Sequence, residues 1–147
     1  NTEVDVFGLA NYTPLGDAAE DTLRNVLKNN GWTVFADIKN AANQGLDVIA
    51  QHPITKKIYI FEVKANTSRL SKLQKNEVNY VMKRLEEAAK GSINNIPISS
   101  QVKKEAEKIL DEIEKYGMSK FEVRYTVKKS KKTYNVKFKK TKKWNHH

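Results

Sequence analysis

Cysteine is absent from this chain of 147 residues, which excludes disulfide bonds and thiolate zinc sites and leaves the redox compartment open. No apolar run approaches the roughly 20 residues that span a bilayer, and there is no signal-peptide pattern. We therefore expect a soluble protein with no membrane insertion by this domain. Histidine is scarce. His52 has no second histidine or cysteine at ligand spacing, and His146 and His147 are excluded from any site.

Alternating helix and strand patterns, without an internal repeat, predict a single domain over residues 1–147. Helices are expected where apolar residues recur at helical spacing, and strands where they alternate. The expected helices cover residues 17–30, about 70–88 and 99–116, and the expected strands lie within 45–64 and 121–138. Residues 91–98 are expected to form a loop. The expected fold class is α/β (α+β), with a central mixed β-sheet flanked by helices.

The segment Gly45–Lys64, GLDVIAQHPITKKIYIFEVK, predicts a β-hairpin. Its two arms are rich in Val, Ile, Tyr and Phe, which favour strands, and Pro53 lies between them, where a missing backbone donor is tolerated. If the turn centres between Ile54 and Thr55, the numbers of cross-strand partners add up to 109. The register of the whole hairpin follows from that turn, since a shift of one residue would reverse every side chain.

This register places Asp47 opposite Glu62, on one face of the sheet, with their Cβ atoms roughly 5 Å apart. Lys64 lies two residues beyond Glu62 on the same face, opposite Gly45. Two carboxylates this close repel each other unless a cation lies between them. Carboxylate oxygens suit Mg²⁺ or Mn²⁺, and admit Zn²⁺. Such a metal polarises a phosphoryl oxygen and acidifies a bound water, and Lys64 could position that water.

A structural alternative makes Asp47 a turn residue and pairs Glu62 with Lys64 on a solvated face. Glu62 follows the apolar run Ile58–Phe61, which is typical of a strand covered on both faces. A charge in such a run needs a partner or a function, and this favours the metal-site hypothesis.

Glu20 is a further candidate metal ligand. It lies in the expected helix 17–30, three residues after the predicted N-cap Asp17, and at the edge of the apolar stripe beside Leu27. An ordinary capping role and a role as a ligand are both open, and they are compatible. In the next expected helix, Gln74 has capping-box spacing from Ser71, so capping and a role at the site are again both open.

Positive charge is concentrated near the end of the sequence. Nine lysines and no acidic residue lie between Lys128 and Lys143, which accounts for nine of the ten net positive charges. A lysine-rich C-terminal β-hairpin and basic tail, residues 128–147, are therefore expected. Edge lysines that block aggregation are the alternative, but nine exceed that need. A phosphate-backbone footprint fits better, with weak sequence specificity and strong salt dependence. The candidate nucleic-acid-binding residues are Lys128, Lys129, Lys131, Lys132, Lys137, Lys139 and Lys140.

Asp47, followed after fourteen residues by Glu62-Val63-Lys64, resembles the signature of the PD-(D/E)XK, or restriction-endonuclease-like, nuclease superfamily. The resemblance covers roughly residues 13–90, and Leu46 stands where the signature has proline. It implies a restriction-endonuclease-like core and metal-dependent hydrolysis of phosphodiesters. It also implies metal ligation by Asp47, Glu62 and Glu20, catalytic assistance by Lys64 and Gln74, and a phosphate contact by Lys72. DNA is favoured as the target, from the habits of the superfamily, and tRNA stays open.

The N-terminal stretch Val4–Ala10, VDVFGLA, resembles the junction before the variable toxin of rearrangement-hotspot (Rhs) proteins, with Val6 in place of the usual proline. The segment Gly45–Gln74 is also similar to restriction-endonuclease-fold toxins of contact-dependent inhibition and related bacterial competition systems. These resemblances imply the toxin domain of a larger secreted effector, delivered to the cytoplasm of a target cell and neutralised by a cognate immunity protein. Residues 1–12 would be a linker remnant, and an acidic immunity partner would suit the lysine-rich surface.

Two other functions are consistent with the same residues. One is a housekeeping nuclease of the superfamily, such as a repair enzyme or Holliday-junction resolvase, which would not be toxic when expressed alone. The other is a non-catalytic basic module that binds nucleic acid or protein and whose carboxylates are structural. That module would bind without forming a metal-dependent product.

Overall fold

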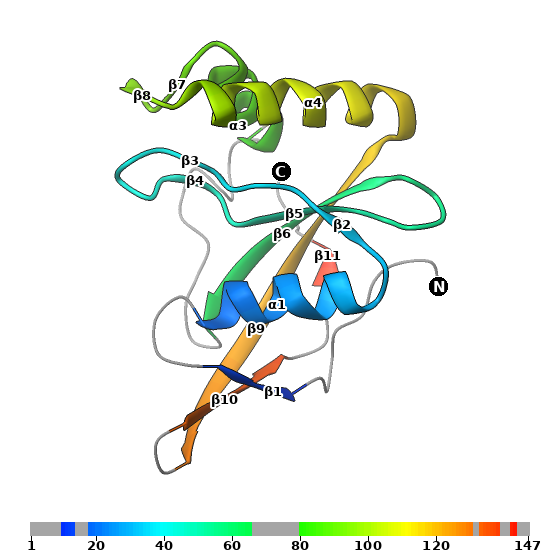
Figure 1. The fold of residues 1–147 in the computed structure, drawn as a ribbon, viewed down its shortest axis with the longest axis vertical. Helices are drawn as coiled ribbons and strands as arrows, with labels where there is room; N and C mark the ends of the chain where they lie inside the picture. The colour runs from blue at the N-terminus through cyan, green and yellow to red at the C-terminus, as the bar shows by residue number, and fades with distance from the viewer. Residues whose placement is uncertain (1–9, 14–17, 66–79, 131–132, 139–141, 144–147) are drawn as a thin grey trace.

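In a computed structural model of the protein, the described residues are 10–13, 18–65, 80–130, 133–138 and 142–143. The largest sheet contains β1 (Ala10–Thr13), β2 (Thr33–Val34), β5 (Val48–Gln51), β6 (Ile58–Ala65), β9 (Met118–Ser130), β10 (Thr133–Phe138) and β11 (Lys142–Lys143). Its strand order is β1-β10-β9-β6-β5-β2, and β11 pairs with β9 (Figure 1). The neighbours β6 and β9 are parallel and the other pairs are antiparallel, so the expected mixed sheet is confirmed.

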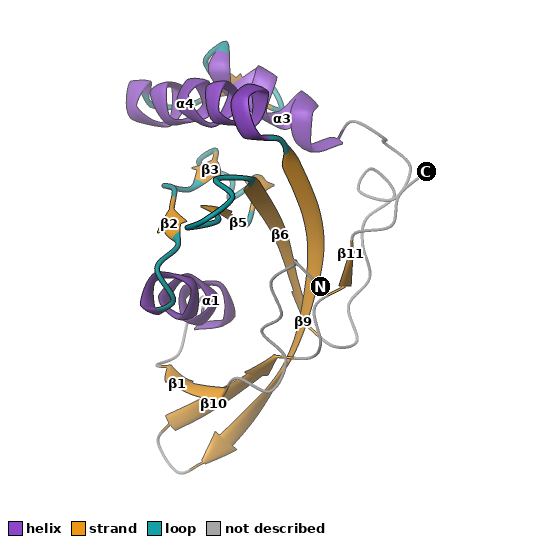
Figure 2. Cartoon of the chain, turned by 90° about the vertical axis from the view of Figure 1, so that its right-hand side faces the viewer, coloured by secondary structure: helices purple, strands orange, loops and turns teal. Residues whose placement is uncertain are grey.

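Helices flank this sheet. They are α1 (Ala18–Asn29), α3 (Tyr80–Ala89) and α4 (Ser100–Tyr116). Figure 2 shows α1 apart from the α3 and α4 pair, which lies near the start of β9. The expected architecture of a mixed sheet flanked by helices is therefore confirmed. Within the described part of the chain, no helix is both long and apolar enough to cross a membrane.

Strand β6 is covered on both faces, which explains its apolar sequence. Its alternate residues Tyr59, Phe61 and Val63 belong to a core with α1, and Ile58 and Ile60 belong to a second core with α3 and α4. The α1 core also contains Leu23, Val26, Leu27, Trp32, Phe121 and Val123, and the second core also contains Val81, Leu85, Ala88, Ala106 and Ile109. The two cores hold the strand that carries Glu62 between two layers of helix.

The helix ends follow local signals in the sequence. Helix α1 ends before Gly31, whose φ of 87° suits glycine. At α4, the Ser99 hydroxyl accepts a 3.2 Å hydrogen bond from the Val102 N–H, and Gly117 closes the helix by donating to the Ile113 carbonyl. Helix α3 occupies the second half of the helix expected over about 70–88, and residues 66–79 lie outside the described residues.

The hairpin of β5 and β6 has the expected register. Ile49 pairs with Ile60, Val48 pairs with Phe61, and the His52 N–H donates to the Lys57 carbonyl. The numbers of these partners add up to 109, so the predicted turn position is confirmed. The half-buried His52 ring stabilises the turn, because its Nδ1 accepts hydrogen bonds from the backbone N–H groups of Ile54 and Thr55.

One part of the hairpin prediction was wrong. The ladder ends at Val48, so Asp47 does not pair with Glu62 as predicted. Gly45 pairs with Lys39 instead of lying opposite Lys64. This pairing joins β3 (Ile38–Lys39) to β4 (Gly45–Leu46). The backbone of Gly45 has a φ of 144°, and a Cβ there would overlap the Ile38 carbonyl. Glycine therefore permits β4 to approach β3 closely, which turns the chain away from β6 before Asp47.

Two further expectations differ from the structure. Residues 91–98 form a small hairpin of β7 (Ser92–Ile93) and β8 (Ile96–Pro97) instead of a loop. Its turn residues Asn94 and Asn95 have φ values of 50° and 65°, which asparagine tolerates in tight hairpins. At the N-terminus, β1 pairs with β10, so the last residues of the expected linker 1–12 lie in the sheet.

At the other end of the sequence, β10 pairs with the second half of β9, from Ser130 and Thr133 to Tyr125 and Phe138. Residues 131–132 between them lie outside the described residues. Strand β11 pairs with β9 at Phe121 and Glu122. The first half of β9 is bound to β6, so this long strand joins the hairpin to the C-terminal strands.

Candidate active site

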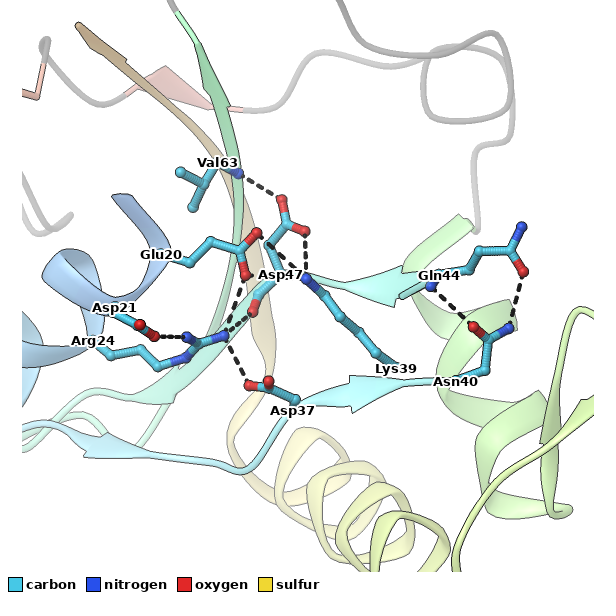
Figure 3. A network of polar contacts seen from close by, with 9 residues as sticks. All are labelled: Glu20, Asp21, Arg24, Asp37, Lys39, Asn40, Gln44, Asp47 and Val63. Atoms are coloured by element: carbon cyan, nitrogen blue, oxygen red, sulfur yellow. Dashed lines mark hydrogen bonds and ion pairs between the residues drawn. The ribbon is translucent and has the colours of Figure 1, made fainter. Parts of the chain in front are cut away.

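Asp47 is the residue between β4 and β5, where the backbone bends. Its side chain is only 14% exposed. Asp47 Oδ2 accepts a 2.9 Å hydrogen bond from the backbone N–H of Val63, the residue after Glu62 in β6 (Figure 3). Beyond the pair of Val48 with Phe61, this contact from side chain to backbone takes the place of a further backbone pair. It fixes the Asp47 carboxylate at the end of the hairpin.

Glu20, from the first turn of α1, points toward the same place. The ammonium of Lys39 lies between the two carboxylates, with Nζ 3.0 Å from Glu20 Oε1 and 3.4 Å from Asp47 Oδ1. All three side chains are largely buried, with exposed fractions of 23% for Glu20 and 11% for Lys39. Two carboxylates from distant parts of the chain therefore converge on one positive charge.

Lys39 reaches this position through the pairing of β3 with β4. Its backbone partner in that pair is Gly45, two residues before Asp47. The Asn40 side chain holds the connection that follows, because its Oδ1 accepts hydrogen bonds from the backbone N–H groups of Ala42 and Gln44. The short β3–β4 hairpin is thus the element that brings a lysine to the carboxylates.

Arg24 fastens α1 to the bend. Its Nη2 donates to the Asp47 carbonyl at 3.0 Å, and lies 2.8 Å from Asp37 Oδ1 and 3.3 Å from Glu20 Oε1. Its Nη1 lies 2.7 Å from Asp21 Oδ1. A planar guanidinium serves several acceptors in fixed directions, so Arg24 orients the backbone of Asp47 relative to the helix.

The charges at this site influence one another. Burial and the negative charge of Asp47 raise the pKa of Glu20, although Lys39 and Arg24 act in the opposite direction. Burial opposes the charge on Lys39, but Asp47 and Glu20 outweigh it and raise the pKa of that ammonium. The protein therefore holds the Glu20 carboxylate in an environment where ionisation is disfavoured, as is common at functional sites.

Glu62 lies in β6 and is 3% exposed. Its backbone is in register with that of Glu122 in the parallel strand β9. Lys64 belongs to the same strand, with its backbone in register with that of Arg124, and the structure describes its backbone but not its side chain. The bond from Val63 to Asp47 connects the backbone next to Glu62 with the site of Glu20 and Asp47.

The remaining candidate residues are less well placed by the structure. Gln74 and Lys72 lie outside the described residues, as do Lys131, Lys132, Lys139 and Lys140. The backbones of Lys128, Lys129 and Lys137 are described, in β9 and β10. The structure thus brings together Glu20 and Asp47, with Glu62 on the adjoining strand.

Sequence reasoning missed Lys39 and Arg24. For Arg24 a signal was available, because it follows Glu20 by four residues, the spacing of ion pairs on a helix. Lys39 gave no such signal. It belongs to a strand of two residues, and its neighbours at the site come from α1 and from the bend at Asp47.

The donor atoms suit a hard divalent cation. Within the described ranges, no group of three or more histidine, cysteine, aspartate or glutamate side chains is disposed to hold a metal ion. Glu20 and Asp47 nevertheless direct carboxylate oxygens at a common cation, the ammonium of Lys39. Carboxylates are the ligands that Mg²⁺ and Mn²⁺ prefer, so the chemistry of this pair fits such a metal.

No protein-family model matches the chain, and no curated protein matches it either. The chemistry of the site is therefore the basis on which a function can be assigned.

Proposed function

We propose that this protein is a metal-dependent endonuclease with a restriction-endonuclease-like core, which hydrolyses phosphodiester bonds of nucleic acid. The observation that carries the proposal is the convergence of the Glu20 and Asp47 carboxylates on one cation, beside the strand that bears Glu62 and Lys64. The sequence motif formed by Asp47, Glu62 and Lys64 supports the same reaction class.

In this proposal Asp47, Glu62 and Glu20 hold a divalent metal, Mg²⁺ or Mn²⁺, with help from the Val63 carbonyl. When bound there, such a metal would supply Lewis acidity toward a phosphoryl oxygen and would lower the pKa of a water molecule. The Val63 N–H fixes the direction of the Asp47 carboxylate, and Arg24 fixes the backbone that carries it. Such preorganisation reduces the reorganisation needed during the reaction.

The other residues act on the water and the substrate. Lys64 positions the attacking water, and Gln74 orients it. The water oxygen forms a bond to phosphorus as the bond from phosphorus to the leaving oxygen breaks. The water gives up a proton to solvent, and the leaving oxygen takes up a proton from solvent to become a hydroxyl. Lys72 contacts the phosphate, while the lysines of β9, β10 and the tail hold the backbone of the nucleic acid through its phosphates.

The parent protein is proposed to be a secreted bacterial competition effector, of which this chain is the toxin domain. The N-terminal stretch Val4–Ala10 and the segment Gly45–Gln74 support this assignment through their resemblance to such toxins. The partner would be an immunity protein with an acidic surface. Expression in bacteria without that partner is expected to be toxic, whereas Glu62→Gln should be tolerated. Equal growth with both variants would favour a housekeeping nuclease.

The first experiment incubates the protein with plasmid DNA and with total tRNA, in Mg²⁺, Mn²⁺, Zn²⁺ or EDTA at constant salt. Glu62→Gln and the matched control Glu107→Gln, an exposed glutamate of α4, are tested in parallel. We expect cleavage of one substrate, dependent on metal and on Glu62, and unaffected by the control. Binding without cleavage under all conditions would favour the non-catalytic module.

A further inference from the structure

The ammonium of Lys39 lies where the proposed function would place a metal ion, between Glu20 and Asp47. Among the described residues, the polar contacts of its Nζ are with Glu20 and Asp47 alone. These are two of the carboxylates to which the proposed function assigns the metal. An ammonium ion placed between two carboxylates neutralises their repulsion in the same way as a bound metal ion does.

A divalent cation and this ammonium cannot use the same oxygens together. Two positive centres about 3 Å apart repel strongly in a largely buried site. Arg24 is not the cation that a metal would displace. Its guanidinium is fixed by Asp21, Asp37 and the Asp47 carbonyl as well as by Glu20. Lys39 has no such further anchors among the described residues, and its flexible four-carbon stem allows the ammonium to move while β3 stays in place.

We propose that Lys39 is an internal counter-ion that occupies the cation position of the metal-free protein and is displaced when a divalent cation binds. This role rests on the proposed metal-dependent function. Without metal, the Lys39 ammonium would offset the repulsion between the Glu20 and Asp47 carboxylates. The same role also predicts that the affinity for metal is set by competition with Lys39. Hydrogen bonds to charged groups are worth about 1.5–3 kcal/mol, so removal of the competing ammonium should raise affinity by about tenfold or more.

The test compares the wild-type chain with Lys39→Met and with Lys104→Met, an exposed lysine of α4 that makes the same change in net charge. Mn²⁺ affinity is measured by calorimetry or by electron paramagnetic resonance, without nucleic acid. We expect Lys39→Met to bind Mn²⁺ about tenfold more tightly or better, and Lys104→Met to resemble the wild type. The metal-free Lys39→Met protein should melt at a lower temperature, and Mn²⁺ should raise its melting temperature more than that of the wild type.

A second measurement needs no variant and remains available if Lys39→Met does not fold. The wild-type protein is acetylated with an amine-reactive reagent, with and without Mn²⁺, and modification of Lys39 is measured by mass spectrometry. We expect Mn²⁺ to increase labelling of Lys39 several-fold and to leave Lys104 unchanged. Unchanged or reduced labelling of Lys39 in saturating Mn²⁺ would overturn the displacement.

The outcomes separate the two proposals. Equal Mn²⁺ affinity in the wild type and Lys39→Met, or no Mn²⁺ binding by either, would overturn the counter-ion role. Tight binding of Mn²⁺ with displacement of Lys39, but without cleavage of any nucleic acid, would support the counter-ion role and contradict the proposed nuclease.

Discussion

The backbone N–H of Val63 donates a 2.9 Å hydrogen bond to Asp47 Oδ2, which joins β6 to the bend between β4 and β5. This bond uses one oxygen of the carboxylate, and the other oxygen lies near Lys39. Asp47 therefore has two separable tasks. One oxygen stabilises the end of the hairpin, and the second is directed at the cation.

Asp47→Asn should separate these tasks. The amide oxygen can still accept from Val63, so the fold should persist, but the neutral side chain is a poorer metal ligand. We expect cleavage to fall by roughly a hundredfold or more, since the metal supplies several kcal/mol of transition-state stabilisation. Asp37→Asn is the matched control, because Asp37 also contacts Arg24 but is 57% exposed. Retention of full activity by Asp47→Asn would show that the site is misplaced.

Gly45→Ala tests the close approach of β4 to β3. The substitution meets both an unfavourable φ and overlap with the Ile38 carbonyl. The unfavourable φ alone costs about 1–3 kcal/mol, and the overlap adds to that cost. Gly91→Ala is the control, since its φ is also positive but the added Cβ meets no atom within 4 Å. Urea unfolding should show a larger loss of stability for Gly45→Ala. Equal losses would mean that backbone conformation alone, and not the contact with β3, requires glycine at residue 45.

The pKa of Glu20 predicts how stability depends on pH in the absence of metal. Burial and the charge of Asp47 raise this pKa above its ordinary value of 4.5. The folded state therefore holds the proton more tightly than the unfolded chain does. Stability from this group is present below that ordinary value and is lost as pH rises through the folded-state pKa.

Glu20→Gln removes this loss. Melting temperatures in EDTA, measured from about pH 4 to pH 8, should show the variant equal to the wild type at the acidic end and more stable near neutrality. Glu107→Gln, an exposed substitution of the same chemistry, should show no such trend. If Glu20→Gln melts lower than the wild type at neutral pH, the contacts of Glu20 with Lys39 and Arg24 outweigh its burial.

The lysines near the end of the sequence predict a strong salt dependence of binding. Each phosphate contact contributes about 0.9 to the slope of log affinity against log salt concentration on duplex DNA. The double variant Lys128→Gln and Lys137→Gln should therefore lower the slope by up to about 2 and weaken binding to all sequences alike. The control replaces Lys103 and Lys104, which are exposed on α4. Fluorescence anisotropy in EDTA measures binding without cleavage, and an unchanged slope would contradict the footprint.

Local signals in the sequence were sufficient for much of the fold. Ser99 and Gly117 mark the ends of α4, and Pro53 between two strand-forming runs gives the register of β5 with β6. These features depend on neighbouring residues, so they can be read directly. The small hairpin at Asn94 and Asn95 was missed because its strands have only two residues each, too few for an alternating pattern.

The site was harder to predict than the fold. The motif indicated Asp47, the resemblance to the superfamily added Glu20, and the structure places both near the Lys39 ammonium. It could not indicate Lys39, because that position depends on the turn of the chain at Gly45. The positive φ of this glycine and the bend that follows it are not visible in the sequence. Counting residues from the turn assumes one continuous strand, so it misses the change of direction at Gly45.

If the proposed nuclease acts on duplex DNA, strand β9 has a geometric consequence for the length of its substrate. It is 13 residues long, it is in register with Glu62 at Glu122, and it ends at Ser130 beside the start of β10. At about 3.3 Å per residue, the stretch from Glu122 to Ser130 spans roughly 26 Å, or about eight base pairs at 3.4 Å each. Strand β9 would then set the distance between the proposed cleavage site beside Glu62 and the lysines that bind the phosphates. Duplexes too short to reach both would be cut poorly, whatever their sequence.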